Sequence, residues 1–348
     1  MKNKSVVKRK ILTVVIGLLL LISYILGNIE MGKLGSKMDY VNLLSQGDEN
    51  GMTYSLVESA HQRNQQSDEP LQFVNWCQES GGKVSYKELN RMETAEIMAV
   101  YGRTDLLFSD CEVMDIENKT GCLISKGLAF RLLGGTDVVG NILEYNSREY
   151  EIIDVVESDI PLFVYELGEE DSSIVLDRAT MICIQNSPKQ TKAAYDKAAG
   201  MWSLVDYQMI FYGIKIVYFI VPWMLGVGLL LSIRRYKNSA RKSVVNRINR
   251  ISDDSIKNYL KKNREWMIWE MIMFTVIQIR VPLDIIPDKW SNFEFWSEFY
   301  KNKQESVLLM RSMKRGVVDL GYITGFQRAS IIGVISIVQA RTLARLIA

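Results

Sequence analysis

The chain has 348 residues, of which 48% are hydrophobic and 24% charged, and its formal net charge is +2. This composition argues against a disordered chain, and the balanced charge gives no indication of a nucleic-acid partner. The length is sufficient for two or more domains.

The first long apolar segment follows a basic N-terminus at residues 1–10. Residues 11–27 carry no charge, so we expect a membrane span at 11–29, near the short end of the spanning range. Basic residues collect at the cytoplasmic ends of membrane helices. We therefore expect a protein of the cell membrane whose N-terminus lies in the cytoplasm. A cleaved signal peptide has the same order of basic and apolar residues, but no small-x-small cleavage site follows Gly27.

The second apolar segment is uncharged over residues 216–233 and is followed at once by Arg234 and Arg235. We expect this span at 207–233, with its basic end in the cytoplasm. Residues 30–206 then form a large extracytoplasmic domain inserted between the first two spans. The expected fold class is an α-helical multi-pass membrane protein, with about four membrane helices and a large α+β domain.

The first part of the inserted domain gives mixed signals. Residues 39–62 predict a broken helix, "LQFVNWC" and "GKVSYKEL" predict strands, and a helix is expected near 93–101. All four cysteines of the chain lie in this domain, where disulfides are compatible with the compartment and three connectivities are open: Cys77, Cys111, Cys122 and Cys183. Cys183 also fits a buried strand position in "ATMICIQN".

A glycine cluster at residues 134–140 invites comparison with a phosphate-binding loop. It follows a predicted strand, "GCLIS", and a predicted short helix, "KGLAFRLL", and it precedes a predicted hairpin that turns at Asn146 and Ser147. Phosphate loops place their glycines before a helix, where free amide groups face the anion. Here Gly134 and Gly135 follow the helix, so we expect a C-cap with positive φ angles and no bound nucleotide.

The order of these elements resembles the extracytoplasmic core domain of MacB-type permeases of ABC transporters, the group that includes FtsX. In that family a strand ends in serine, a short helix carries an alanine and ends in Gly-Gly, and a hairpin ends in a V-x-V-V strand. The positions that fit this pattern are Ser125, Ala129, Leu133, Gly134, Gly135, Val139, Gly140, Tyr150, Ile152, Val155 and Val156. An unrelated α+β domain whose helix happens to end in Gly-Gly is the alternative.

The segment after the second span, residues 234–263, is basic and has apolar residues at near-helical spacing. The resemblance implies a cytoplasmic coupling segment that docks on an ATPase through Val244, Ile248, Ile251 and Tyr259. A helix resting on anionic lipid is the other interpretation.

Two further spans are expected, at 264–286 and, more weakly, at 317–339, with a cytoplasmic tail at 340–348. Both spans contain ionisable residues, which would face a bundle interior or a partner: Glu270 lies in the first, and Asp319 and Arg328 interrupt the second. For Glu270, a snorkelling position at the interface is equally consistent. The tail resembles the family ending, but Gln339 replaces a proline.

Between these spans, residues 287–316 form an outer loop with six aromatic residues among charges. This pattern predicts an amphipathic helix at the membrane surface. An aromatic platform for a carbohydrate or peptide is the competing hypothesis.

No nucleophile motif or metal-ligand spacing is evident, and His61 is the only histidine. We therefore expect no enzyme activity and no cofactor in this chain. The resemblance implies a permease subunit of an ABC-type complex, with ATP and magnesium on a separate cytoplasmic ATPase and a second permease copy or related permease beside it. An extracellular protein or peptide would be the substrate or partner. A membrane-anchored binding or sensing protein and an anchored cell-wall enzyme are the alternatives.

Overall fold

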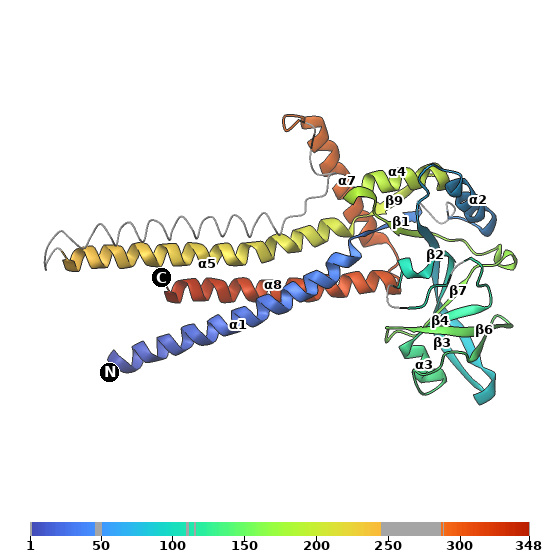
Figure 1. Cartoon of the computed structure of the whole chain (residues 1–348), viewed down its shortest axis with the longest axis horizontal. Coiled ribbons are helices and arrows are strands. Elements are labelled where there is room, and N and C mark those ends of the chain that lie inside the picture. Colours follow the sequence, from blue (N-terminus) through green and yellow to red (C-terminus); the bar gives the residue numbers. More distant parts are fainter. Residues whose placement is uncertain are drawn as a thin grey trace. The chain divides into compact units, whose positions relative to one another are not determined.

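The computed structural model describes residues 2–45, 51–108, 111–114, 116–244, 287 and 289–347. The chain divides into two compact units (Figure 1). One, which we call the helical unit, comprises residues 1–38, 207–281 and 321–348. The other, which we call the inserted domain, contains Asp39–Asp206 and Pro282–Leu320.

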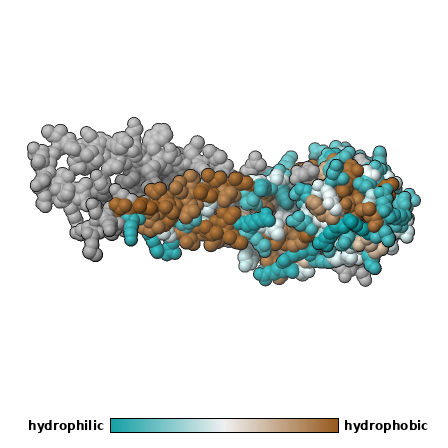
Figure 2. Space-filling model, turned by 90° about the horizontal axis from the view of Figure 1, so that it is seen from below, coloured by the Kyte–Doolittle hydropathy of each residue, from teal (hydrophilic) through white to brown (hydrophobic). Residues whose placement is uncertain are grey.

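The helical unit contains α1 (Lys2–Lys37), α5 (Tyr207–Val244) and most of α8 (Val317–Ile347). In the described part of the chain, these three helices are long and apolar enough to cross a membrane. Figure 2 shows a mostly hydrophobic surface over their described residues. The expected span at 264–286 lies outside the described residues.

The three helices pack through small and apolar side chains. Leu20, Val221 and Ala340 are buried together. Gly27 lies directly against the ring of Tyr218, where a Cβ would meet ring atoms at 2.2 Å. The Tyr218 hydroxyl donates a hydrogen bond of 2.6 Å to a backbone carbonyl of α8, so close approach and hydrogen bonding occur at one crossing, as in many membrane helix pairs.

Gln339, at the position where the resembling family has proline, also takes part in this packing. Its Oε1 accepts a hydrogen bond of 2.7 Å from Ser23, which in turn is 3.1 Å from the Ser336 hydroxyl. The helix α8 continues past this point to Ile347, so the segment predicted as a tail is helical and continuous with the expected span. Likewise, α5 continues past 233 to Val244.

The inserted domain is built on one nine-stranded sheet with the order β3-β7-β4-β6-β5-β2-β8-β1-β9. Its strands are β1 (Tyr40–Ser45), β2 (Phe73–Tyr86), β3 (Arg91–Gly102), β4 (Gly121–Ser125), β5 (Ile142–Tyr145), β6 (Arg148–Val156), β7 (Leu162–Glu166), β8 (Arg178–Ile182) and β9 (Trp202–Val205). Because β2 also pairs with β3, the six strands from β3 to β2 close into a ring. β3–β7 and β4–β6 are parallel pairs, and the other pairs are antiparallel.

Three helices cover one face of this sheet: α2 (Tyr54–Gln65), α3 (Lys126–Leu132) and α4 (Pro188–Ala199). Figure 1 shows α3 beside the closed ring and α4 near β1 and β9. The opposite face carries a second apolar cluster, which includes Trp76, Met98 and Val164, and Val317 and Val318 of α8 pack against it. The fourth helix, α7 (Phe293–Ser312), lies in the segment predicted as an outer loop and makes contacts with β9.

The prediction of a helix near residues 93–101 is wrong, because this segment forms β3. Ala95, Ile97 and Ala99 join the helix-covered core, while Met98 and Val100 join the cluster on the opposite face. A strand buried on both faces loses the alternation of apolar and polar residues that identifies strands in a sequence. Its alanine, glutamate and methionine then favoured a helix by propensity alone.

The broken helix predicted over residues 39–62 is also partly wrong. Its first part is β1, which pairs with both β8 and β9, and only the second part, α2, is helical. The pairing partners of β1 come from residues more than a hundred positions later in the chain, so local sequence carries little information about them.

The predicted strand, short helix and hairpin around the glycine cluster are confirmed. They correspond to β4, α3 and the antiparallel pair β5–β6. Asn146 and Ser147 have φ angles of 49° and 63°, as a two-residue hairpin turn requires. Gly134 has the expected positive φ of 81°, but Gly135 does not share it.

Candidate functional site

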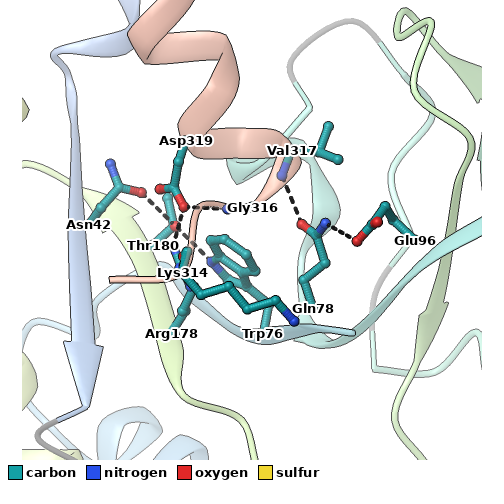
Figure 3. A network of polar contacts seen from close by, with 10 residues as sticks. All are labelled: Asn42, Trp76, Gln78, Glu96, Arg178, Thr180, Lys314, Gly316, Val317 and Asp319. Atoms are coloured by element: carbon teal, nitrogen blue, oxygen red, sulfur yellow. Dashed lines mark hydrogen bonds and ion pairs between the residues drawn. The ribbon is translucent and has the colours of Figure 1, made fainter. Parts of the chain in front are cut away.

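A group of buried polar contacts in the inserted domain surrounds the start of α8. In Figure 3, side chains from β1, β2, β3 and β8 converge on the residues that lead into this helix. All of these groups belong to the inserted domain, including the first turn of α8 up to Leu320.

An ion pair between Arg178 and Asp319 forms the centre of this site. Arg178 is the first residue of β8, and its Nη1 donates to the carboxylate of Asp319 while its Nη2 donates to the Lys314 carbonyl. The side chains of the pair are only 8% and 3% exposed. The guanidinium also lies over the ring of Trp76, 5.0 Å from its centroid, on the neighbouring strand β2. Burial makes each charge strongly dependent on the other.

The same residues cap the N-terminus of α8. Asp319 Oδ2 accepts a hydrogen bond of 2.8 Å from the Gly316 N–H, and Gln78 Oε1 accepts one of 2.8 Å from the Val317 N–H. These are two of the amide groups that a helix leaves without an internal partner. One cap therefore comes from the helix itself and the other from β2.

The glycine at position 316 permits this close contact with β2. A Cβ there would stand 2.7 Å from Gln78 Oε1 and 3.5 Å from the Trp76 ring. Gln78 is fixed in turn, because its Nε2 donates to Glu96 on β3 at 2.9 Å.

A second chain of hydrogen bonds holds Trp76 in place beneath the guanidinium. Its indole N–H donates to Thr180 Oγ1 at 3.0 Å, and the Thr180 hydroxyl donates to Asn42 Oδ1 at 2.9 Å. The three residues come from β2, β8 and β1, so the site is supported across the sheet. Burial raises the pKa of the adjacent Asp177 carboxyl, and the positive charge of Arg178 opposes that shift.

A further ion pair ties α7 to the end of the sheet. Lys303 of α7 contacts Asp206, whose side chain is 4% exposed and which directly follows β9. The next residue, Tyr207, is the first of α5. The inserted domain thus carries one ion pair at the start of α8 and another at Asp206, the residue that precedes α5.

The residues of the family-like motif have structural roles. Ser125 ends β4 and caps α3, since its fully buried hydroxyl accepts hydrogen bonds from Leu128 N–H at 3.1 Å and from Leu162 N–H at 2.9 Å. Ala129 lies on the buried face of α3 and is fully buried. Gly140 has a φ of 85°, and its N–H donates to the Ile152 carbonyl.

None of the four cysteines, all of which lie in described segments, forms a disulfide in this structure. Cys77 on β2 lies opposite Ala99, and Cys122 on β4 lies opposite Tyr165 and Ile152. Neither therefore has a cysteine as its cross-strand partner. Burial raises the pKa of the Cys77 thiol to about 12 and also raises that of Cys122.

The predicted coupling residues and Glu270 fall at or beyond the end of α5. Val244 is the last residue of α5, while Ile248, Ile251, Tyr259 and Glu270 lie outside the described residues. Arg328 is exposed on α8. In the part of the chain that the structure describes, no group of three His, Cys, Asp or Glu side chains could hold a metal ion.

Sequence reasoning missed Arg178, Trp76 and Gln78, and it treated Asp319 only as an interruption of an apolar span. One signal was available: Gly316 followed three residues later by Asp319 at the start of an apolar run is typical of a capped helix N-terminus. The partner Arg178, 141 positions earlier, had no such local signal.

No family model matches the chain, and no curated protein does. Among solved structures, the periplasmic region of MacB from Actinobacillus actinomycetemcomitans is similar to it, with a TM-score of 0.37 and 12% identity over 47% of this chain and 85% of that one. The extracellular domain of the noncanonic ABC-type transporter YknZ from Gram-positive bacteria is also similar, with a TM-score of 0.36 and 14% identity over 46% of this chain and 92% of that one.

Proposed function

We propose that this chain is the permease subunit of an ABC-type complex of the MacB and FtsX kind. A separate cytoplasmic ATPase would hydrolyse ATP, and the membrane helices would pass the resulting movement to the inserted domain. The observation that carries this proposal is the buried Arg178–Asp319 pair, which fixes the first turn of a candidate membrane helix to the sheet of the inserted domain.

Because of this pair, α8 cannot shift or rotate at its first turn without moving the sheet or separating the two charges. Separating the partners of a buried pair leaves an uncompensated charge and costs about 3–5 kcal/mol. The other two connections are short as well. Only Met38 and Asp39 separate α1 from β1, and only Asp206 separates β9 from α5. Short connections of this kind transmit displacement with little slack.

The basic residues that flank the first two spans support an extracytoplasmic position for the inserted domain. The segment after α5 would then be cytoplasmic and would dock on the ATPase through Val244, Ile248, Ile251 and Tyr259. Magnesium and ATP would be bound by that partner, and this chain would act without enzyme activity of its own. Two permease copies, or this chain and a related permease, would form the membrane part.

The work performed by such a complex would be a change of shape outside the membrane. It would serve the export of a peptide or lipoprotein, or the control of an extracellular partner.

The proposal is tested by purifying the full-length chain from its native membranes and identifying the proteins that accompany it. We expect an ATPase with magnesium-dependent activity. Replacing Ile248 and Ile251 with aspartate should remove it, because charges would be placed in the docking surface. Leu89→Asp, at an exposed position of the inserted domain, is the matched control and should retain the ATPase.

If no ATPase accompanies the wild-type chain, the permease function is refuted, and a membrane-anchored binding or sensing protein becomes the better explanation. If the ATPase is present but the double substitution leaves it bound, the docking residues are wrong.

A further inference from the structure

We propose that the aromatic end of α7 is a lipid anchor that lies in the headgroup region of the bilayer. The anchor consists of Trp290, Phe293, Trp296, Phe299 and Tyr300. This inference concerns the membrane partner of the inserted domain, and it does not depend on the presence of an ATPase.

The aromatic residues of this segment are unusually exposed. Trp290, Phe293 and Tyr300 are 74%, 84% and 73% exposed, and none of the residues of α7 is buried. Exposed large apolar side chains are common singly, but a contiguous group of them indicates an interaction surface.

Three of these rings, those of Trp290, Trp296 and Phe299, lie close together. The ring centroids of Trp290 and Trp296 are 5.9 Å apart, and those of Trp296 and Phe299 are 6.2 Å apart. The indole N–H of Trp296 donates to the Trp290 carbonyl at 3.3 Å, which holds the residue before the helix against it. Phe293, Trp296 and Tyr300 follow the i, i+3, i+7 spacing of a single helix face.

Contacts and short connections within the inserted domain link this helix to the residues from which two candidate membrane helices continue along the chain. Lys303, three residues beyond Tyr300, pairs with Asp206, and the next residue in the chain begins α5. At its other end, α7 is followed by only four residues, 313–316, before α8 begins. Both α5 and α8 are candidate membrane spans. The aromatic group therefore belongs to a helix that contacts the residue before α5 and is joined to α8 by a four-residue connection.

Lipid is the occupant that best fits this location. Tryptophan and tyrosine concentrate at the membrane–water interface, where the ring is buried among acyl chains and the polar group reaches water. Charged residues at 294, 298 and 301 interrupt the aromatic ones, which suits a helix lying in the plane of the interface and not across the bilayer. A soluble sugar or peptide would have no need of a site tied to two spans.

The test is a nitroxide probe on the full-length chain in phosphatidylcholine bilayers. The probe is attached at Phe293→Cys, or at Met92→Cys as the control, with Cys111 and Cys183 replaced by serine. Met92 is 62% exposed near the start of β3, on a strand that is not joined to a candidate membrane helix. Collisions with oxygen, which dissolves in lipid, and with a water-soluble nickel chelate are then compared.

We expect the ratio of oxygen to nickel collisions at position 293 to exceed that at 92 severalfold, and Lys303→Ala to lower it by releasing α7. A ratio at 293 equal to the control would place the aromatic group in water and overturn the proposal. Protection from both reagents would also overturn it, because it would show a protein contact such as a second copy. A probe in water that becomes shielded only when a soluble sugar or peptide is added would establish the ligand platform instead.

Discussion

The tie between the sheet and α8 predicts a large effect of the substitution Asp319→Ala. The change removes the carboxylate that balances Arg178 and leaves a guanidinium whose side chain is only 8% exposed. Such a loss costs about 3–5 kcal/mol. The Gly316 N–H loses its acceptor at the same time, and a lost helix cap alone accounts for roughly 1 kcal/mol. We expect most of this cost to appear as opening of the first turn of α8.

Hydrogen exchange on the full-length chain in lipid nanodiscs measures that opening. A fall of about 3–5 kcal/mol in the opening free energy raises the exchange rate of the amides at 316–320 by about a hundredfold to a few thousandfold. The matched control is Lys87→Ala. It breaks the Lys87–Glu149 pair of 2.9 Å, whose side chains are 60% and 59% exposed, and should leave exchange at 316–320 unchanged.

A double variant separates the buried charge from the loss of packing. Arg178→Met with Asp319→Leu removes both charges and fills their space with apolar groups, a replacement that is often close to neutral. It should therefore restore much of the protection that Asp319→Ala loses. Wild-type exchange rates in Asp319→Ala would refute the reasoning, since α8 would then be held by something other than this pair.

Three further outcomes are expected. Burial lowers the pKa of His61 from 6.5 to about 4, so the folded chain favours the neutral imidazole. The free energy of unfolding should therefore fall as the pH drops from 6.5 through 4, by about 3 kcal/mol in total. Thermal unfolding of His61→Leu should lack this pH dependence. Gly134→Ala should destabilise the inserted domain by about 1–2 kcal/mol because φ is 81° there, whereas Gly135→Ala, with an ordinary φ and open space around it, should not change the melting temperature. Alkylation at pH 8 should modify the other two cysteines of the folded chain well before Cys77 and Cys122, whose thiols are buried and have raised pKa values; equal rates by mass spectrometry would contradict the burial.

The parts of the fold that the sequence predicted correctly are those with local causes. The hairpin turn at Asn146 and Ser147 depends on two residues that tolerate positive φ, flanked by alternating strands. The helix from Lys126 depends on Ser125, which caps it from one residue away, and on Gly134, which ends it. Each of these signals lies within a few residues of the structure it produces.

The errors fell where distant segments decide the conformation. Residues 93–101 form a strand because β2 and β7 pair with them on either side, and the two apolar clusters bury both faces. The strand β1 similarly exists through β8 and β9. Pairing of this kind outweighs intrinsic propensity, which is worth well under about 1 kcal/mol per residue.

The sequence by itself determined the membrane character, the inserted domain and the turn chemistry of the glycine cluster, because hydrophobic runs, charge asymmetry and positive-φ residues act locally. Only the tertiary structure decided that β2 and β3 close the sheet, that the cysteines stay apart, and that the first turn of α8 belongs to the inserted domain. Asp319 looked like a defect in an apolar helix until folding brought Arg178 against it. A buried charge has meaning only with its partner, and here 141 positions of chain separate the two.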